Sequence, residues 1–191
     1  MSPVGDPVVL VVEDDSEVAT RYRQHLAANY TFRVATNAQD GLARLNGRVD
    51  VVLVDREATC ISGTDVLSCI RDRDLDGRVA LVTAEEPDVD VLDRGFDAYI
   101  KKPMTASGLT GTVERLLERS KYERLLQDYY AAVAEQATLE SSTRGAALEA
   151  SADYRRLQND IEAIRAELAG TMDGVATDAD FITTIRRLSE R

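Results

Sequence analysis

Short apolar runs alternate with amphipathic segments through the first 119 residues of the chain. The runs are brief and rich in β-branched residues, as strands are, and they cover residues 8–12, 32–35, 51–54, 79–82 and 98–100. The first and third are nearly continuous in valine and leucine, which is typical of strands that are buried on both faces.

The segments between the runs repeat their apolar residues at steps of three and four, as helices do. The stripes are Val18, Tyr22 and Leu26, then Leu42 and Leu45, then Val66, Leu67 and Ile70, and finally Leu109, Val113, Leu116 and Leu117. A fourth helix, around residues 88–94, is short and ends at Gly95. Five strands that are each followed by a helix predict a doubly wound α/β domain with helices on both faces of a parallel sheet.

From residue 120 onward the pattern changes, because strand-like runs and prolines are absent from the rest of the sequence. One apolar stripe with helical spacing extends from Tyr122 to Leu139, and a second extends from Ala147 to Leu168. Gly145, beside a Ser-Ser-Thr cluster, separates them as a turn. A shorter third stripe covers residues 181–188.

Two long helices and a short one predict an antiparallel helical hairpin, or a coiled coil formed between chains. We therefore divide the chain into a domain of residues 1–119 and a domain of residues 120–191. No helix breaker follows Gly111, so the last helix of the first domain is expected to continue into the first helix of the second.

Charged and hydroxyl side chains stand at the points where the predicted strands end. Glu13, Asp14 and Asp15 follow the first strand, Asp55 the third, Thr83 the fourth, and Lys102 the fifth. Because ligands of an open parallel sheet bind at the carboxyl ends of its strands, we expect these side chains to converge. Asp14 or Asp15 alone could equally be a helix cap, but burying Asp55 after an apolar strand would be costly without a cation.

Clustered carboxylates on a solvent-accessible edge favour Mg²⁺, which prefers hard oxygen ligands and keeps several waters. Such a metal beside a carboxylate with a free oxygen supports acceptance of a phosphoryl group. In this interpretation Asp55 is the nucleophile, Glu13 and Asp14 hold the metal, Lys102 neutralises charge and Thr83 adds a hydrogen bond. A glycine-rich phosphate loop is absent from the sequence, so a nucleotide is not expected as the direct ligand.

These residues resemble the receiver domain of two-component response regulators. The resemblance covers residues 6–119 and rests on five ordered motifs: VVLVVEDD at residues 8–15, Asp55, Gly63, Thr83-Ala84, and the stretch from Tyr99 to Pro103. It implies a flavodoxin-like sheet with strand order 2-1-3-4-5 and phosphorylation of Asp55 by a sensor histidine kinase.

The resemblance also assigns roles to single residues. It implies that Glu13 and Asp14 are the acidic pair, that Thr83 is the switch hydroxyl and Lys102 the phosphate-contacting lysine, and that Tyr99 is the rotating aromatic. The main-chain carbonyl of Glu57 would be a further metal ligand, and the Lys102–Pro103 bond would be cis. The sequence departs from the family in having Thr59 where proline is usual, Met104 where an aromatic is usual, and a short segment between Thr83 and Tyr99.

The second domain is similar to the HalX domain that follows receivers in haloarchaeal regulators, on a Tyr/Leu/Ala pattern from Tyr122 to Glu140. We therefore expect a phosphorylation switch that biases the face formed by the fourth helix, the fifth strand and the fifth helix, and thereby controls a helical output domain. Apart from self-catalysed phosphotransfer and dephosphorylation, no enzyme activity is expected.

Three output hypotheses remain open at this stage. The first is a protein-interaction or dimerisation module, which would form a homodimer through the C-terminal helices. The second is a DNA-binding transcriptional regulator, for which Arg155–Arg156 and Arg186–Arg187 are a thin basis. The third is a phosphatase of the haloacid-dehalogenase type, which needs a second acid where Glu57 stands and a cap domain that the sequence does not indicate.

The charge of the chain bears on the second of these hypotheses, DNA binding. The chain has 34 acidic and 23 basic residues, a net charge of −11, which argues against binding nucleic acid through bulk positive charge. Only three basic residues are lysines, and an acidic, lysine-poor surface suits high salt. Cys60 and Cys69 have neither disulfide nor metal spacing, and His25 lies outside the predicted site. The sequence lacks a signal peptide and any run long enough to span a membrane, so we expect a cytoplasmic protein.

Overall fold

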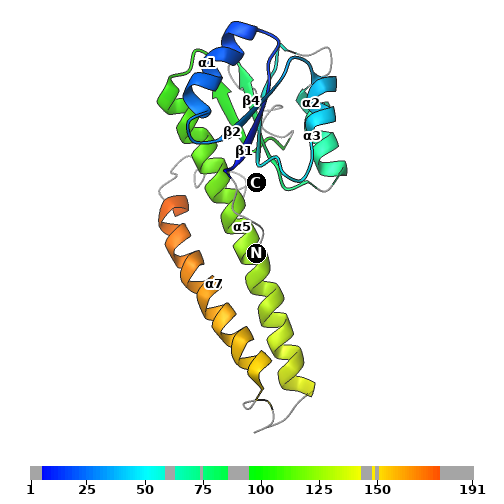
Figure 1. Ribbon diagram of the computed structural model, residues 1–191, viewed down its shortest axis with the longest axis vertical. Helices are drawn as coiled ribbons and strands as arrows, with labels where there is room; N and C mark the ends of the chain where they lie inside the picture. Colours follow the sequence, from blue (N-terminus) through cyan, green and yellow to red (C-terminus); the bar gives the residue numbers. More distant parts are fainter. Residues whose placement is uncertain are drawn as a thin grey trace, which may run out of the picture. The chain divides into compact units, whose positions relative to one another are not determined.

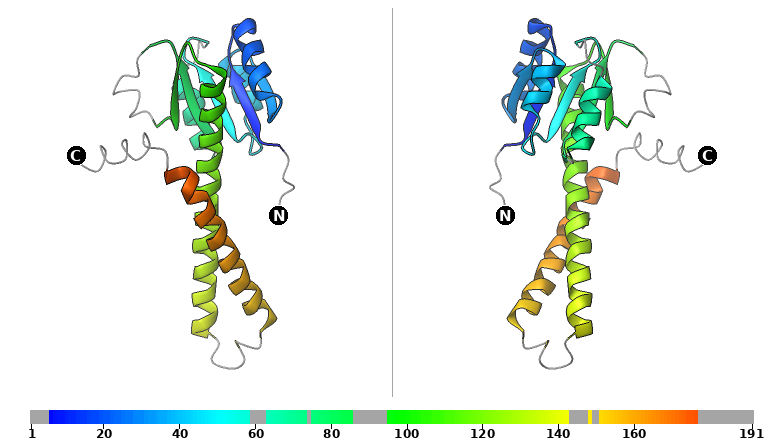
Figure 2. Two further views of the ribbon diagram at one scale, coloured as in Figure 1. Left: turned by 90° about the vertical axis from the view of Figure 1, so that its left-hand side faces the viewer. Right: turned by 90° about the vertical axis from the view of Figure 1, so that its right-hand side faces the viewer.

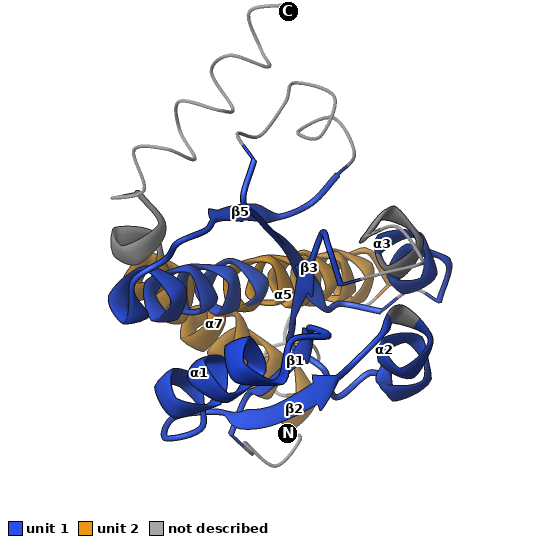
Figure 3. Cartoon of the chain, turned by 90° about the horizontal axis from the view of Figure 1, so that it is seen from above, with its two compact units in different colours: residues 1–120 blue, residues 121–191 orange. Residues whose placement is uncertain are grey.

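The computed structural model of the chain describes residues 6–58, 63–73, 75–85, 95–142, 148 and 151–176. The predicted helix around residues 88–94, the turn at Gly145, the stripe at residues 181–188, and Thr59 and Cys60 lie outside the described residues. The chain divides into two compact units, Met1–Ser120 and Lys121–Arg191, which are coloured separately in Figure 3.

The first unit is built on a parallel sheet (Figure 1). Its strands have the order β2-β1-β3-β4-β5. The strands are β1 (Val8–Val12), β2 (Thr31–Ala35), β3 (Val51–Asp55), β4 (Arg78–Thr83) and β5 (Ala98–Lys101). Every neighbouring pair among them is parallel. The predicted doubly wound fold and its 2-1-3-4-5 order are therefore confirmed.

Two apolar cores cover the two faces of this sheet, because alternate residues of a strand point to opposite sides. Leu10 and Val12 pack in the core beneath α2 (Ala38–Arg44) and α3 (Gly63–Asp72). Val9 and Val11 pack in the opposite core, with residues of α1 (Ser16–Leu26) and of the first turns of α5 (Ala106–Ser142). Figure 3 shows α1 and α5 on one side of the strands and α2 and α3 on the other.

A buried carboxylate fixes the start of β5. Asp97 has a side chain only 5% exposed, and it forms ion pairs with Arg78 at 2.9 Å and Arg71 at 3.2 Å. Its Oδ2 also accepts a hydrogen bond from the backbone N–H of Val79 at 2.9 Å. Two guanidinium groups compensate for the burial of this charge. Asp97 thus ties β5, the strand that leads to Lys102, to β4 and α3.

The second unit contains the later part of α5 and α7 (Ala152–Ala176), which lie side by side in Figure 2. Contacts between the two helices show that they are antiparallel: Lys121 with Glu167 at 2.7 Å, Tyr129 with Arg165 at 3.2 Å, and Glu140 with Tyr154 at 2.6 Å. The expected hairpin is confirmed, and α5 runs without a break from Ala106 to Ser142, as its sequence predicts.

None of the helices among the residues that the structure describes combines the length and the apolar character that a membrane span requires.

Candidate functional site

The ends of four parallel strands bring the predicted site residues to one edge of the sheet. Glu13 follows β1, and its backbone N–H donates to the carbonyl of Ala35 at the end of β2 at 2.9 Å. The end of β3 lies beside β4, where Asp55 pairs in register with Val82. Lys102 follows β5, and its N–H donates to the carbonyl of Thr83 at 2.7 Å. The strand register therefore places acids, a hydroxyl and an ammonium group side by side.

Three carboxylates form a cluster at this edge. Oxygen atoms of Glu13, Asp14 and Asp55 all lie within 4.8 Å of one another. Glu13 and Asp55 are 1% and 4% exposed, whereas Asp14 is exposed to solvent. The Oε1 atom of Glu13 accepts a hydrogen bond from the N–H of Asp15 at 3.2 Å, but its buried Oε2 atom accepts none from the described residues. An orphaned hard oxygen beside two other carboxylates fits a divalent cation such as Mg²⁺.

Lys102 is the cation that the structure places against these acids. Its Nζ lies 2.8 Å from Oδ2 of Asp55 and 3.6 Å from Oε2 of Glu13. Partial burial acts to lower the pKa of Lys102, but the hydrogen bond and charge of Asp55, together with the charge of Glu13, outweigh it and raise the pKa above its ordinary value. Lys102 therefore stays protonated beside the cluster at physiological pH.

The pKa of Glu13 is raised to about 7. Burial of the carboxyl is the main cause, and the negative charge of Asp55 adds to it. The hydrogen bond from Asp15 and the charge of Lys102 act in the opposite direction without cancelling it. Near neutral pH, Glu13 is therefore a carboxyl group that is costly to ionise even with Lys102 beside it, unless a further cation binds.

Thr83 and Glu57 border the acceptor carboxylate. The Thr83 side chain is buried, and its Oγ1 accepts a hydrogen bond from the N–H of Glu85 at 3.1 Å. The N–H of Glu57 donates to Oδ1 of Asp55 at 3.2 Å, so the backbone that follows β3 folds back toward this carboxylate. The peptide bond between Lys102 and Pro103 is cis, as the resemblance implied.

Tyr99 is not part of the carboxylate cluster. It is half-buried against the apolar core beneath α2 and α3, and its ring meets that of Phe96 edge to face with 5.8 Å between centroids. The structure therefore separates the residue that the resemblance names as the rotating aromatic from the groups that would hold the phosphoryl group.

Sequence reasoning left open whether Asp14 or Asp15 is the helix cap, and it missed two further features of the site. Asp15 is the cap of α1, because its Oδ1 accepts from the N–H groups of Glu17 and Val18, so Asp14 is left for the cluster. Burial raises the pKa of the Tyr22 hydroxyl, and the negative charges of Glu13 and Asp55 raise it further, so Tyr22 lies close to these acids. An exposed ion pair joins Arg56 to Glu85, which follow the ends of β3 and β4. The signal in the sequence for this ion pair was a pair of opposite charges within two residues of two adjacent strand ends.

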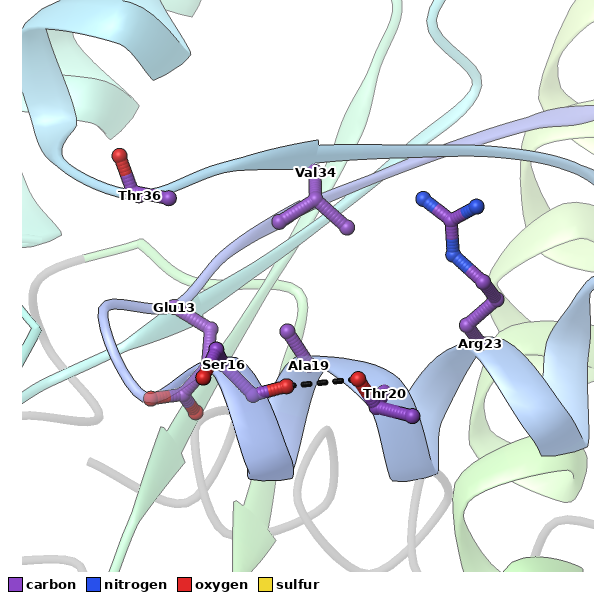
Figure 4. Close-up of a pocket in the computed structure, with 7 residues that line it drawn as sticks. All are labelled: Glu13, Ser16, Ala19, Thr20, Arg23, Val34 and Thr36. Carbon is purple, nitrogen blue, oxygen red and sulfur yellow. Dashed lines mark hydrogen bonds between the residues drawn. The ribbon is translucent and has the colours of Figure 1, made fainter.

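A pocket of about 370 Å³ adjoins the cluster through Glu13 (Figure 4). It lies between α1 and β2 and is lined by small and polar side chains, among them Ser16, Thr20 and Thr36. The guanidinium of Arg23, which also lines it, stacks over the ring of Phe32 at 5.5 Å from its centroid. Asp14, Asp55 and Lys102 do not line this pocket.

The raised pKa of Glu13 predicts how stability changes with pH. The folded chain keeps a proton on Glu13 up to about pH 7, whereas the unfolded chain loses it near the ordinary value of 4.5. Without divalent cations, this group therefore costs stability progressively as the pH rises from about 4.5 through 7. We expect Glu13→Gln to raise the free energy of unfolding at pH 8 by roughly 1–3 kcal/mol, and to change it little at pH 4.5.

The measurement is urea unfolding of both chains in a chelator at the two pH values. Glu118→Gln, at an exposed position on α5, is the matched control and should leave the wild-type pH dependence in place. An unchanged pH slope in the Glu13→Gln variant would contradict the prediction.

Comparisons with known proteins agree with this geometry. The family model of the response regulator receiver domain matches residues 9–114, and that of the HalX domain matches residues 118–185. A provisionally named transcriptional regulator of Haloferax volcanii is 41% identical over 164 residues, which are 85% of this chain and 28% of that protein. The transcriptional regulatory protein PrrA of Mycobacterium tuberculosis is 33% identical over 123 residues, 61% of this chain and 52% of that protein.

Solved structures give the same result for the first unit. The crystal structure of a signal receiver domain from Vibrio parahaemolyticus superposes with a TM-score of 0.59 and 27% identity, and the match covers 64% of this chain and 98% of that domain. The chain spans at most about half the length of the two curated relatives. Its receiver match nevertheless covers more than half of its own residues, so the chain belongs to the response regulator receiver domain family, with a HalX domain after the receiver.

Proposed function

We propose that this chain is a phosphorylation-controlled switch in which Asp55 accepts a phosphoryl group from a sensor histidine kinase. The observation that carries the proposal is the contact of 2.8 Å between Lys102 Nζ and Asp55 Oδ2, at the carboxyl end of the sheet and beside two further carboxylates. A charged ammonium and an acidic pair around one acid are what an acceptor of a phosphoryl group requires.

In the transfer step, a carboxylate oxygen of Asp55 forms the new bond to phosphorus while the phosphorus–nitrogen bond to the donor histidine breaks. The imidazole leaves with the electron pair of that bond. Lys102 neutralises charge on the phosphoryl oxygens, and the Thr83 hydroxyl donates a hydrogen bond to one of them. Glu13, Asp14, Asp55 and the main-chain carbonyl of Glu57 would hold Mg²⁺, which when bound neutralises further negative charge.

The switch follows from what the new anion attracts. Thr83 turns its hydroxyl toward the phosphoryl group, and Tyr99 moves into the space that this leaves. The change biases the face that includes β5 and the start of α5 between two states. Because α5 continues to Ser142, we propose this helix as the route to the HalX unit, which serves as the output and dimerisation module.

The rival hypotheses have weaker support. DNA binding through the C-terminal helices is not favoured, because residues 120–191 have 13 acidic and nine basic residues. A phosphatase of the haloacid-dehalogenase type would need Glu57 as a general acid, whereas Glu57 contacts Asp55 through its backbone N–H. We place the protein in the cytoplasm, with no enzymatic turnover beyond its own phosphorylation and dephosphorylation.

The test uses the full chain, Mg²⁺ and phosphoramidate, a small donor with a phosphorus–nitrogen bond. We expect the intact mass to increase by one phosphoryl group, and the gain to disappear when a chelator removes the metal. Reduction with borohydride followed by peptide mass spectrometry should place the modification on Asp55. Modification of Asp14 or Asp15 instead, or none at all, would contradict the assignment.

A further inference from the structure

The later part of α5 has apolar side chains on every side. Residues 129–134 read Tyr-Tyr-Ala-Ala-Val-Ala, six positions without a charge in a chain with 30% charged residues. Six consecutive residues go more than once around an α-helix. A helix that is apolar all round is normally buried all round.

Helix α7 covers only one side of this segment. Tyr129 lies on the covered side, where its hydroxyl accepts a hydrogen bond from Arg165 and its ring contacts the same guanidinium. Tyr130 is one position further round the helix and is 64% exposed, although its ring contacts that of Tyr129. Among the described residues of this unit, only Tyr154 and Ile161 are buried. Two helices alone thus leave much of their apolar surface in water.

The exposed residues form one stripe. Leu126, Tyr130, Val133 and Ala137 follow steps of four, three and four residues, which places them on one side of α5. Tyr130, Val133 and Ala137 are exposed and Leu126 is half-buried. The nearest acids along the helix, Asp128 and Glu135, lie on the opposite side from Tyr130. We call these four residues the Tyr130 stripe.

We propose that the Tyr130 stripe is covered by the same stripe of a second copy of this chain. The proposal rests on the role proposed above for the HalX unit and names the surface that carries it. The charge of the stripe favours a second copy as the partner. Each copy has a net charge of −11, but the stripe itself is neutral, so two copies can meet there without like-charge repulsion between the contacting side chains.

Nucleic acids and basic proteins lack the charges that would match this stripe. A nucleic acid would need basic residues, yet none occurs between Arg124 and Arg144. A basic protein would need acids on the stripe, and Asp128 and Glu135 lie on the other side of the helix. In a dimer with two-fold symmetry, the Tyr130 stripe of each copy covers that of the other, so the apolar side chains of both are buried. Two hairpins then form a four-helix arrangement.

The test is the molar mass of the full, unphosphorylated chain by sedimentation equilibrium across the micromolar range. We expect a dimer for the wild type, and an at least roughly tenfold weaker dimer for Tyr130→Glu. Because the interface is uncharged, raising the salt concentration should not dissociate the wild-type dimer. Ala131→Glu is the matched control: it adds the same charge one residue away, at an exposed position outside the stripe, and should remain dimeric.

A monomeric wild type, a Tyr130→Glu dimer as tight as the wild type, or equal weakening by Ala131→Glu would each overturn the proposal. A monomer would point instead to coverage of the stripe within one chain. Circular dichroism of Tyr130→Glu should show full helix content, since Tyr130 is not on the side that faces α7. Labelling with phosphoramidate is an independent readout, so a failure of phosphorylation at Asp55 and a failure of dimerisation are distinguished.

Discussion

The Asp55→Asn variant is expected to take up no phosphoryl group from phosphoramidate under conditions that modify the wild type completely. An amide has no anionic oxygen, so it is a poor nucleophile and cannot form a stable acyl phosphate. The side chain is 4% exposed, and asparagine has nearly the same shape, so the packing around the position should be retained. The readout is the intact mass, with circular dichroism to show that the variant is folded.

Asp76→Asn is the matched control for this experiment. Asp76 is exposed and precedes β4, so it lies at the opposite end of that strand from Thr83. It should incorporate as much phosphoryl group as the wild type. Incorporation by Asp55→Asn at the wild-type level would show that another side chain is the acceptor.

The same variant tests the electrostatics of the site. Asp55 is the second cause, after burial, of the raised pKa of Glu13. Removing its charge should lower that pKa while leaving it above its ordinary value. In the absence of divalent cations, the loss of stability with rising pH should therefore move to lower pH, which unfolding measurements at several pH values would show.

Most of the first unit could be predicted from sequence because its strands are buried on both faces. Runs such as residues 51–54 then contain only apolar residues, and a carboxylate directly after such a run marks the strand end. Parallel pairing then determines which strand ends are neighbours. Once the strands lie in register, residues far apart in sequence, such as Asp55 and Lys102, come together at one edge of the sheet. The continuity of α5 was equally predictable, because no helix breaker follows Gly111.

Other features depend on backbone geometry or on tertiary contacts that leave no pattern in the sequence. Asp14 and Asp15 have identical side chains, and the choice of cap is made by the extended backbone of Asp15, with φ −79° and ψ 110°. Tyr22 belongs to an ordinary helical stripe, so its closeness to the acids could not be anticipated. Likewise, the helical spacing of Tyr129 and Tyr130 does not reveal which of the two faces α7.

The Lys102→Met variant is expected to take up a phosphoryl group more slowly than the wild type and to be less stable. Methionine keeps much of the apolar stem but leaves Asp55 and Glu13 without their cation. Because the Lys102 side chain is 23% exposed, we expect the free energy of unfolding at pH 8 without metal to fall by about 2–4 kcal/mol. Phosphoryl incorporation should slow at least roughly hundredfold, since a positive charge on the phosphoryl oxygens is lost.

The pH dependence distinguishes this electrostatic effect from a loss of packing. The raised pKa of Lys102 means that its stabilising contribution is fully present at pH 8 and below. The penalty of the substitution should nevertheless shrink as the pH falls toward about 7. Without the charge of Lys102 the pKa of Glu13 rises further, so the variant takes up this proton at a higher pH than the wild type does. Added Mg²⁺ should likewise restore stability more in the variant than in the wild type.

Lys101→Met supplies the matched control, because Lys101 is the preceding residue and its side chain is exposed at the end of β5. It removes the same charge from the same strand, so a general effect of net charge would appear in both variants. We expect it to lower the free energy of unfolding by less than Lys102→Met does, because the Lys101 side chain is exposed. If both variants lose stability and phosphorylation equally, the position of the ammonium group does not matter, and Lys102 has no special role at Asp55.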